Sequence, residues 1–206
     1  MRFRYLFVAA AIALNAAADV QHVIYVHGKA VEDGGRRPTT GYGVYEYDAI
    51  LDTLQREGFA VSSEQRPSNA DPAVFARRVR DEVRSLIDDG AEPSSITVIG
   101  ASKGAVITML ASTLLQEPQV RYVLLGNCND SIFERYPTRL SGRVLSIYET
   151  SDTFGHSCQR FFERAGKLTE HQELRLELGI GHSFLYTPNQ AWVKPAAEWI
   201  RREQPQ

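Results

Sequence analysis

The sequence predicts an α/β protein, a three-layer α/β/α sandwich around a mainly parallel sheet of about six strands. Short, continuous runs of apolar and β-branched residues recur along the chain, as in strands that are buried on both faces. Between them lie longer stretches whose apolar residues have the 3.6-residue spacing of amphipathic helices. Strands that alternate with helices in this way form parallel sheets covered on both sides.

The elements follow from local signals. The expected strands are 23–26, 59–64, 96–99, 122–125, 144–148 and 173–178. The expected helices are 45–57, 71–90, 103–115, 159–165 and 190–201, with a polar, glycine-rich loop over 32–42. Residues 96–99 are the clearest strand because all four are β-branched. Asp71-Pro72 is typical of a helix start, since Asp caps the first turn and proline fits its first position.

The amino-acid composition excludes several classes of protein. The 206 residues are 43% hydrophobic and 23% charged, which suits a globular chain with one sizeable core. These figures exclude a disordered chain, a collagen, a coiled coil and a disulfide-dense miniprotein. The net charge is −2 and no more than two basic residues are consecutive, so we expect no nucleic-acid partner.

The first eighteen residues have the layout of a secretory signal. Arg2 and Arg4 precede an apolar run over 5–14, and Ala16–Ala18 stand just before Asp19. A run of about ten residues is too short to cross a bilayer. We expect a signal peptide over 1–18, one domain over 19–206, and a periplasmic or secreted protein without a stable membrane anchor. The alternatives are an N-terminal core strand and a wrong start codon.

Export changes how the two cysteines, Cys128 and Cys158, are interpreted. In an oxidising compartment an even pair is expected to be bridged. The bridge would close a loop of about 30 residues and constrain the unfolded chain by about 3–4 kcal/mol. Two cysteines without a supporting His or Cys cluster make a poor zinc site, and we expect no metal.

The central motif is Gly100-Ala101-Ser102-Lys103-Gly104, which reads G-x-S-x-G between a predicted strand and a predicted helix. In this setting it predicts a nucleophile elbow, a turn so sharp that Gly100 and Gly104 must lack side chains. The serine hydroxyl then stands at the carboxyl edge of the sheet, facing the amino end of the helix. The alternative is a glycine-rich turn with an idle serine.

From Val23 to Arg201 the chain resembles the α/β-hydrolase superfamily. The matching features are a strand ending in His27-Gly28, the elbow at Ser102, an acid after a late strand and a histidine after the last one. The first two strands of the family sheet are missing, and the short segment between Leu125 and Arg143 leaves no room for a cap. The chain is therefore similar to minimal, lidless members such as small secreted esterases and lipases.

His182 is the expected general base. It follows the last strand directly, at the carboxyl edge, where its imidazole can take the proton of Ser102. His156 is the reserve candidate, whereas His171 is placed at the start of a strand, at the wrong edge. His22 and His27 belong to the start of the first strand and to the turn after it.

Asp152 is the expected acid, because it lies just past the strand 144–148, where the family keeps this residue. A carboxylate there holds the imidazole in the required tautomer. Glu149, which is closer to the strand, and Asp130, which follows the previous strand, are the alternatives.

The resemblance implies that the oxyanion hole consists of the backbone N–H groups of Lys29 and Lys103. They follow His27-Gly28 and Ser102 directly, and His27-Gly28-Lys29-Ala30 departs from the H-G-G-G motif of one esterase subgroup. The two lysine side chains either form a positive rim that favours substrates with a carboxylate or phosphate, or point to bulk water.

Several aromatic residues are candidates for an acyl pocket. The segment 184–188 and Trp192 either line such a pocket or pack the last helix. Tyr42, Tyr45 and Tyr47 are likewise pocket walls or core residues.

The resulting prediction is an exported serine hydrolase that cleaves a carboxylic ester or thioester through an acyl-enzyme on Ser102. We expect a small-molecule acyl substrate, no cofactor and a monomer. The alternatives are an acyltransferase with the same triad and a binding module that has the fold without the chemistry.

Overall fold

The computed structural model describes residues 20–202, so the predicted signal peptide lies outside the described residues. A six-stranded sheet runs through its centre, with every neighbouring pair parallel. The strand order is β4-β1-β5-β6-β7-β8. The strands are β1 (His22–Val26), β4 (Ala60–Ser62), β5 (Ile96–Ala101), β6 (Arg121–Leu125), β7 (Ser141–Glu149) and β8 (Lys167–Leu176). The predicted parallel sheet of about six strands is confirmed.

The five predicted helices are also present. They are α2 (Tyr47–Arg56), α3 (Pro72–Asp88), α4 (Lys103–Leu115), α6 (Gln159–Glu163) and α7 (Gln190–Arg201). The start of α3 follows from its cap, because Asp71 Oδ1 accepts the N–H groups of Ala73 at 2.8 Å and Val74 at 2.9 Å. None of the helices within 20–202 is both long and apolar enough to cross a membrane.

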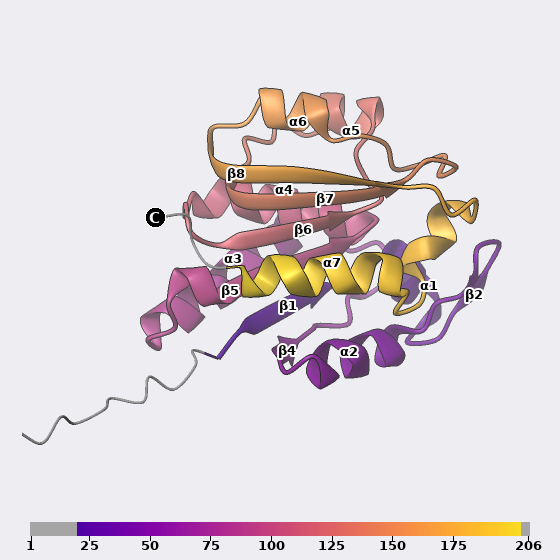
Figure 1. Ribbon diagram of the computed structural model, residues 1–206, viewed down its shortest axis with the longest axis horizontal. Coiled ribbons are helices and arrows are strands. Elements are labelled where there is room, and N and C mark those ends of the chain that lie inside the picture. Colours follow the sequence, from indigo (N-terminus) through magenta and orange to yellow (C-terminus); the bar gives the residue numbers. More distant parts are fainter. Residues whose placement is uncertain (1–19, 203–206) are drawn as a thin grey trace, which may run out of the picture.

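The helices cover both faces of the sheet, and alternate residues of each strand point to opposite faces. In Figure 1, α7 lies in front of the sheet while α3 and α4 lie behind it. The core in front combines α2 and α7 with strand residues that include Tyr25, Ile99, Val123 and Ile147. The core behind combines α3, α4 and α6 with Ile24, Val98, Leu124 and Val144. The expected three layers are confirmed.

Some elements differ from the prediction. The expected loop over 32–42 instead contains the end of α1 (Lys29–Gly34) and the strand β2 (Thr39–Thr40), which forms a hairpin with β3 (Gly43–Val44) just beyond this range. The segment between β6 and β7 holds one unpredicted helix, α5 (Asp130–Arg135). Two 3₁₀ turns, η1 (Pro93–Ser95) and η2 (Gly181–Leu185), were also not predicted.

The last strand begins at Lys167, well before its predicted start at residue 173. It is an edge strand whose residues are exposed or half-buried almost throughout, so its sequence lacks the apolar pattern of a buried strand. Pairing with the β7 backbone determines its length instead. His171 therefore lies within β8 and not at its start.

The parallel arrangement gathers the segments that follow β1, β5, β7 and β8 at one end of the molecule. These segments carry Lys29, Ser102, Asp152 and His182, respectively. They come together at the right-hand side of Figure 1, beyond the arrowheads.

The first turn of α4 lies directly against the end of β1. A Cβ atom built on Gly104 would lie 1.9 Å from the carbonyl oxygen of Val26 and 2.6 Å from that of His27. A Cβ on Gly100 would lie 2.4 Å from Thr108 Oγ1. Both glycines of the motif are therefore required by close backbone packing.

We expect Gly104→Ala to lower the free energy of unfolding by about 3 kcal/mol or more, because the methyl group overlaps backbone atoms that cannot move away. Gly41→Ala is the control, since no atom lies within 4 Å of the added methyl group. Urea denaturation followed by circular dichroism measures both. Equal effects of the two substitutions would contradict this packing.

Candidate active site

Ser102 stands at the junction between β5 and α4 in an unusual backbone conformation. Its φ is 52° and its ψ −120°, which is strained for a residue other than glycine. Its backbone N–H donates to the carbonyl oxygen of Leu125 at 2.9 Å, across to the end of β6. The turn therefore holds the serine between the ends of two strands.

The structure brings Ser102, His182 and Asp152 together in one chain of hydrogen bonds. The Ser102 Oγ to His182 Nε2 distance is 2.9 Å, and the His182 Nδ1 to Asp152 Oδ2 distance is 2.7 Å. Asp152 and His182 are buried. With Nδ1–H donating to the carboxylate, Nε2 is free to accept the serine proton, as general-base chemistry requires.

The reserve candidates lie elsewhere. Asp130 is exposed at the start of α5 and pairs with Arg160. His156 is exposed, and its backbone N–H donates to the carbonyl oxygen of Cys128 at 2.7 Å. The His171 ring packs on Phe162 with the ring centroids 4.6 Å apart. None of these three side chains belongs to the chain of hydrogen bonds at Ser102.

Glu149 has a role that the sequence did not reveal. It is buried at the end of β7 and accepts the backbone N–H groups of Leu178, Gly179 and Gly181 at 3.0–3.1 Å. It also accepts the N–H of Ser151 at 2.8 Å and the Ser151 hydroxyl at 2.5 Å. Burial disfavours its charge, but these hydrogen bonds outweigh burial and lower the pKa of Glu149. One carboxylate thus anchors the segments that carry Asp152 and His182.

His27 is buried and its ring is fixed by two hydrogen bonds. Nε2 accepts the backbone N–H of Arg66 at 3.0 Å, so Nδ1 carries the proton and donates to the carbonyl oxygen of Gly28 at 2.9 Å. Burial, together with the nearby charge of Arg66, lowers the pKa of His27 to about 4. The ring supports the turn that leads into α1.

Lys29 and Lys103 are the first residues of α1 and α4, so their backbone N–H groups have no acceptor within their own helices. A Cβ built on Gly28 would lie only 3.5 Å from Ser102 Cβ, which places the start of α1 beside the serine. Both lysine side chains are ion-paired, that of Lys29 in solvent and that of Lys103 mostly out of it. Lys29 pairs with Asp33, and Lys103 Nζ lies 2.5 Å from the buried carboxylate of Glu32.

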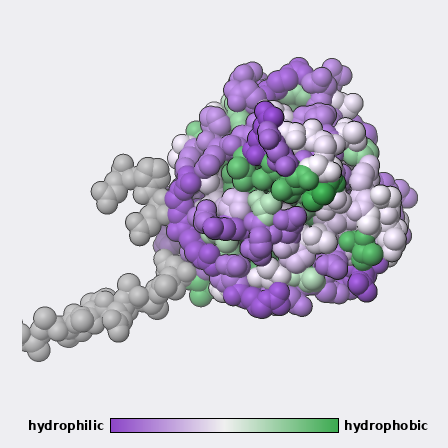
Figure 2. Space-filling view, turned by 45° about the vertical axis from the view of Figure 1, so that its right-hand side comes forward, coloured by the Kyte–Doolittle hydropathy of each residue, from purple (hydrophilic) through white to green (hydrophobic). Residues whose placement is uncertain are grey.

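A cavity of about 290 Å³ opens beside Ser102 and His182. Its apolar wall consists of Tyr42, Tyr45, Phe154, Leu185 and Tyr186. Tyr42 and Phe154 contact each other and both flank the His182 ring, with ring centroids 5.3–6.0 Å apart. Figure 2 shows apolar surface in a hollow at this end of the molecule, surrounded by hydrophilic surface.

The other predicted pocket residues belong to the core. Phe184, Trp192 and Tyr47 are fully buried among the helices in front of the sheet. The proposed acyl-pocket segment is therefore divided between the cavity wall and the packing of α7.

A second cavity of about 610 Å³ adjoins the first at Ser102, Lys29 and Phe154. Polar and charged residues contribute much of its lining, among them Asn127, Asn129 and Arg135. Ser102 therefore stands where an aromatic cavity and a more polar one meet.

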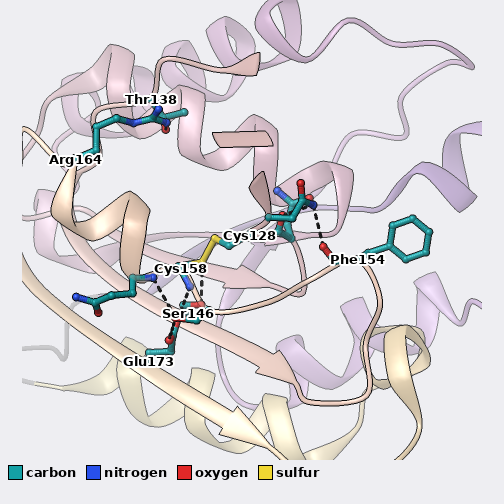
Figure 3. The surroundings of a disulfide bond; sticks show 11 residues. Cys128, Thr138, Ser146, Phe154, Cys158, Arg164 and Glu173 are labelled. Atoms are coloured by element: carbon teal, nitrogen blue, oxygen red, sulfur yellow. Dashed lines mark hydrogen bonds between the residues drawn. A yellow bond between two sulfur atoms is a disulfide. The ribbon is translucent and has the colours of Figure 1, made fainter. Parts of the chain in front are cut away.

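Cys128 and Cys158 are disulfide-bonded, with their Cα atoms 5.1 Å apart (Figure 3). Beside the bond, the Cys158 N–H donates to Glu173 Oε2 at 2.6 Å. Asn129 Nδ2 donates to the carbonyl oxygen of Phe154 at 2.9 Å. The disulfide joins the end of the segment that carries Asp152 and Phe154 to the residues that follow β6.

No protein-family model and no curated protein sequence matches this chain. Solved structures do match it. SOBER1 from Arabidopsis thaliana is 16% identical with a TM-score of 0.59, covering 88% of this chain and 98% of its own. A structure from the pair LipS and LipT, two metagenome-derived lipolytic enzymes, is 14% identical with a TM-score of 0.58, covering 90% and 96%.

MGS-M1, an α/β hydrolase from a Medee basin deep-sea metagenome library, is 15% identical with a TM-score of 0.58. The match covers 88% of this chain and 84% of that one. At such low identity these likenesses show that the chain has the α/β-hydrolase fold, as its sequence predicted, and they show the fold alone.

We expect reduction of the disulfide to lower the ester-hydrolysing activity predicted from the sequence before it unfolds the domain. The bridge braces the segment that carries Asp152, while both cysteines lie outside the strands of the sheet. Ester hydrolysis and circular dichroism, followed together in a titration with dithiothreitol, measure the two effects. A simultaneous loss of activity and of structure, or no change in either, would contradict the expectation.

The buried, neutral His27 predicts a pH-dependent stability. The ring takes up a proton near pH 6.5 when unfolded but only near pH 4 when folded. The free energy of unfolding should therefore be highest above pH 6.5 and fall by up to about 3 kcal/mol as the pH drops to 4.

Denaturant titrations of the wild type and of His27→Gln across this pH range test the assignment. The variant should show a flatter dependence than the wild type. A His27→Gln profile with the wild-type slope would refute it.

Proposed function

We propose that this chain, which has the α/β-hydrolase fold, is a serine hydrolase that cleaves a carboxylic ester or thioester. The observation that carries the proposal is the chain of hydrogen bonds from Ser102 Oγ to His182 Nε2 and from His182 Nδ1 to Asp152 Oδ2. Its order and orientation are those that activate a serine for nucleophilic attack.

In the proposed reaction, His182 takes the hydroxyl proton as Ser102 Oγ attacks the carbonyl carbon. Asp152 holds the imidazole and stabilises its charged form. The backbone N–H groups of Lys29 and Lys103 bind the oxyanion of the tetrahedral intermediate. His182 then gives the proton to the leaving group, and a water molecule, activated by the same imidazole, releases the acyl group from Ser102.

The surroundings of the serine support an ester with an apolar part. The wall formed by Tyr42, Tyr45, Phe154, Leu185 and Tyr186 suits an acyl chain or an apolar alcohol. The matched structure from the pair LipS and LipT, which shares the fold, comes from enzymes described as lipolytic. The open cavities leave room for substrates of varied shape.

Export is part of the proposal. The pattern of residues 1–18 predicts a cleaved signal peptide, and the Cys128–Cys158 bond is compatible with an oxidising compartment. The proposed location is the periplasm or the extracellular medium, and the proposed active form is a monomer.

A fluorophosphonate probe tests the proposal directly, because it labels only an activated serine. We expect the mature protein to be labelled and the variants Ser102→Ala and His182→Ala to be unlabelled. Ester hydrolysis should fall by about 10⁴-fold or more in both variants. Ser131→Ala, which removes an exposed serine on α5, is the matched control and should keep both properties.

Circular dichroism must show that each protein is folded. A folded, disulfide-bonded wild type that is neither labelled nor active on esters would overturn the proposal in favour of a binding module.

A further inference from the structure

Three charged side chains form a buried cluster beside the candidate active site, outside the proton transfers. The Glu32 carboxylate on α1 accepts Arg66 Nε at 2.8 Å through Oε1 and Lys103 Nζ at 2.5 Å through Oε2. The side chain of Glu32 is 0% exposed, that of Arg66 2% and that of Lys103 19%. Charges buried this deeply are tolerated only when they remain paired, so the contacts constrain the segments that carry them.

These segments surround the start of α1. Lys103 is the first residue of α4, and Arg66 lies between β4 and α3. The Arg66 guanidinium also donates from Nη2 to the carbonyl oxygen of His27, two residues before Lys29. The Ser68 hydroxyl donates to the carbonyl oxygen of Glu32 at 3.1 Å.

The helix α1 depends on such contacts. It has only six residues, and its N-cap residue, Gly28, provides no capping side chain. A helix of this length is not stable on its own. Its first N–H group, that of Lys29, keeps its direction only if tertiary contacts hold the helix.

We propose that Glu32 is a positioning residue that fixes the two backbone donors of the oxyanion hole relative to each other. This inference rests on the proposed function. Glu32 lies one turn after Lys29 on α1, and its carboxylate holds the side chain of Lys103. A single carboxylate thus joins the helix that provides one donor to the residue that provides the other.

A purely stabilising role and a positioning role predict different measurements. A group that only stabilises the fold changes the melting temperature but leaves kcat unaltered in the folded protein. Displaced oxyanion donors lower kcat with little effect on KM, because the oxyanion develops only as the transition state is approached.

The chain provides a matched control at the opposite end of the sheet. Glu170 on β8 also bridges two cations, since Oε2 accepts Arg143 Nη2 at 2.6 Å and Oε1 accepts Arg202 Nη1 at 2.9 Å. Its ion-pair partner Arg143 lies near the start of β7, toward the amino ends of the strands. Glu170→Gln therefore weakens a similar cluster away from the oxyanion hole.

The experiment compares Glu32→Gln, Lys103→Met and Glu170→Gln with the wild type. Glu32→Gln keeps the size of the side chain but places an amide donor against a cation. Lys103→Met keeps the backbone N–H and the Arg66–Glu32 pair, so it tests the link even if Glu32→Gln does not fold. Melting temperature, kcat, KM and the rate of fluorophosphonate labelling are measured for each.

We expect Glu32→Gln and Lys103→Met to lower kcat and the labelling rate by roughly 10- to 100-fold, with KM within about twofold of the wild-type value. Glu170→Gln should lower the melting temperature but keep kcat. The inference is overturned if kcat of both Glu32→Gln and Lys103→Met stays within about twofold of the wild-type value. It is also overturned if Glu170→Gln lowers kcat as much as these two variants do. An unlabelled, inactive wild type would instead refute the proposed function.

Discussion

The close contact between the first turn of α4 and the end of β1 is the constraint on which the rest of the site depends. Gly104 allows the α4 backbone to touch the carbonyl groups of Val26 and His27, and Gly100 allows the turn before it. This approach holds Ser102 at a positive φ and places it beside the backbone of Gly28. The serine and the starts of both helices, α1 and α4, therefore take their positions from one piece of backbone packing.

The sequence predicted most of the sheet and the gathering of Ser102, Asp152 and His182, because parallel strands place the segments after them at one edge. The helices α4 and α7 begin and end at the predicted residues, since apolar spacing, turn glycines and caps mark them locally. The first part of the edge strand β8, before residue 173, and the short helices α1 and α5 were missed because pairing and packing, rather than local pattern, form them. The catalytic roles of the three gathered residues remain a prediction.

The anchoring contacts of two carboxylates outside the hydrogen-bond chain, Glu32 and Glu149, were not predicted from the sequence for a related reason. Glu32 contacts Lys103 at a separation of 71 residues, and Glu149 contacts the segment 178–181 about 30 residues later. Nothing in the neighbouring sequence indicates such partners. Glu32 joins α1 to Arg66 and Lys103, and Glu149 joins the end of β7 to the segment 178–181, so each buried carboxylate holds two or more segments together beside the candidate site.

The anchoring of two segments on Glu149 bears on how the protein can change over evolution. The stretches that carry Asp152 and His182 share one acceptor, so an insertion in either would separate the two side chains. The β2–β3 hairpin and the α5 segment lie outside this anchor, yet they contribute Tyr42 and Arg135 to the cavities. Length changes there can reshape the cavities while the imidazole and its carboxylate stay in register, so for the proposed hydrolase we expect related chains with other substrates to differ in these two segments.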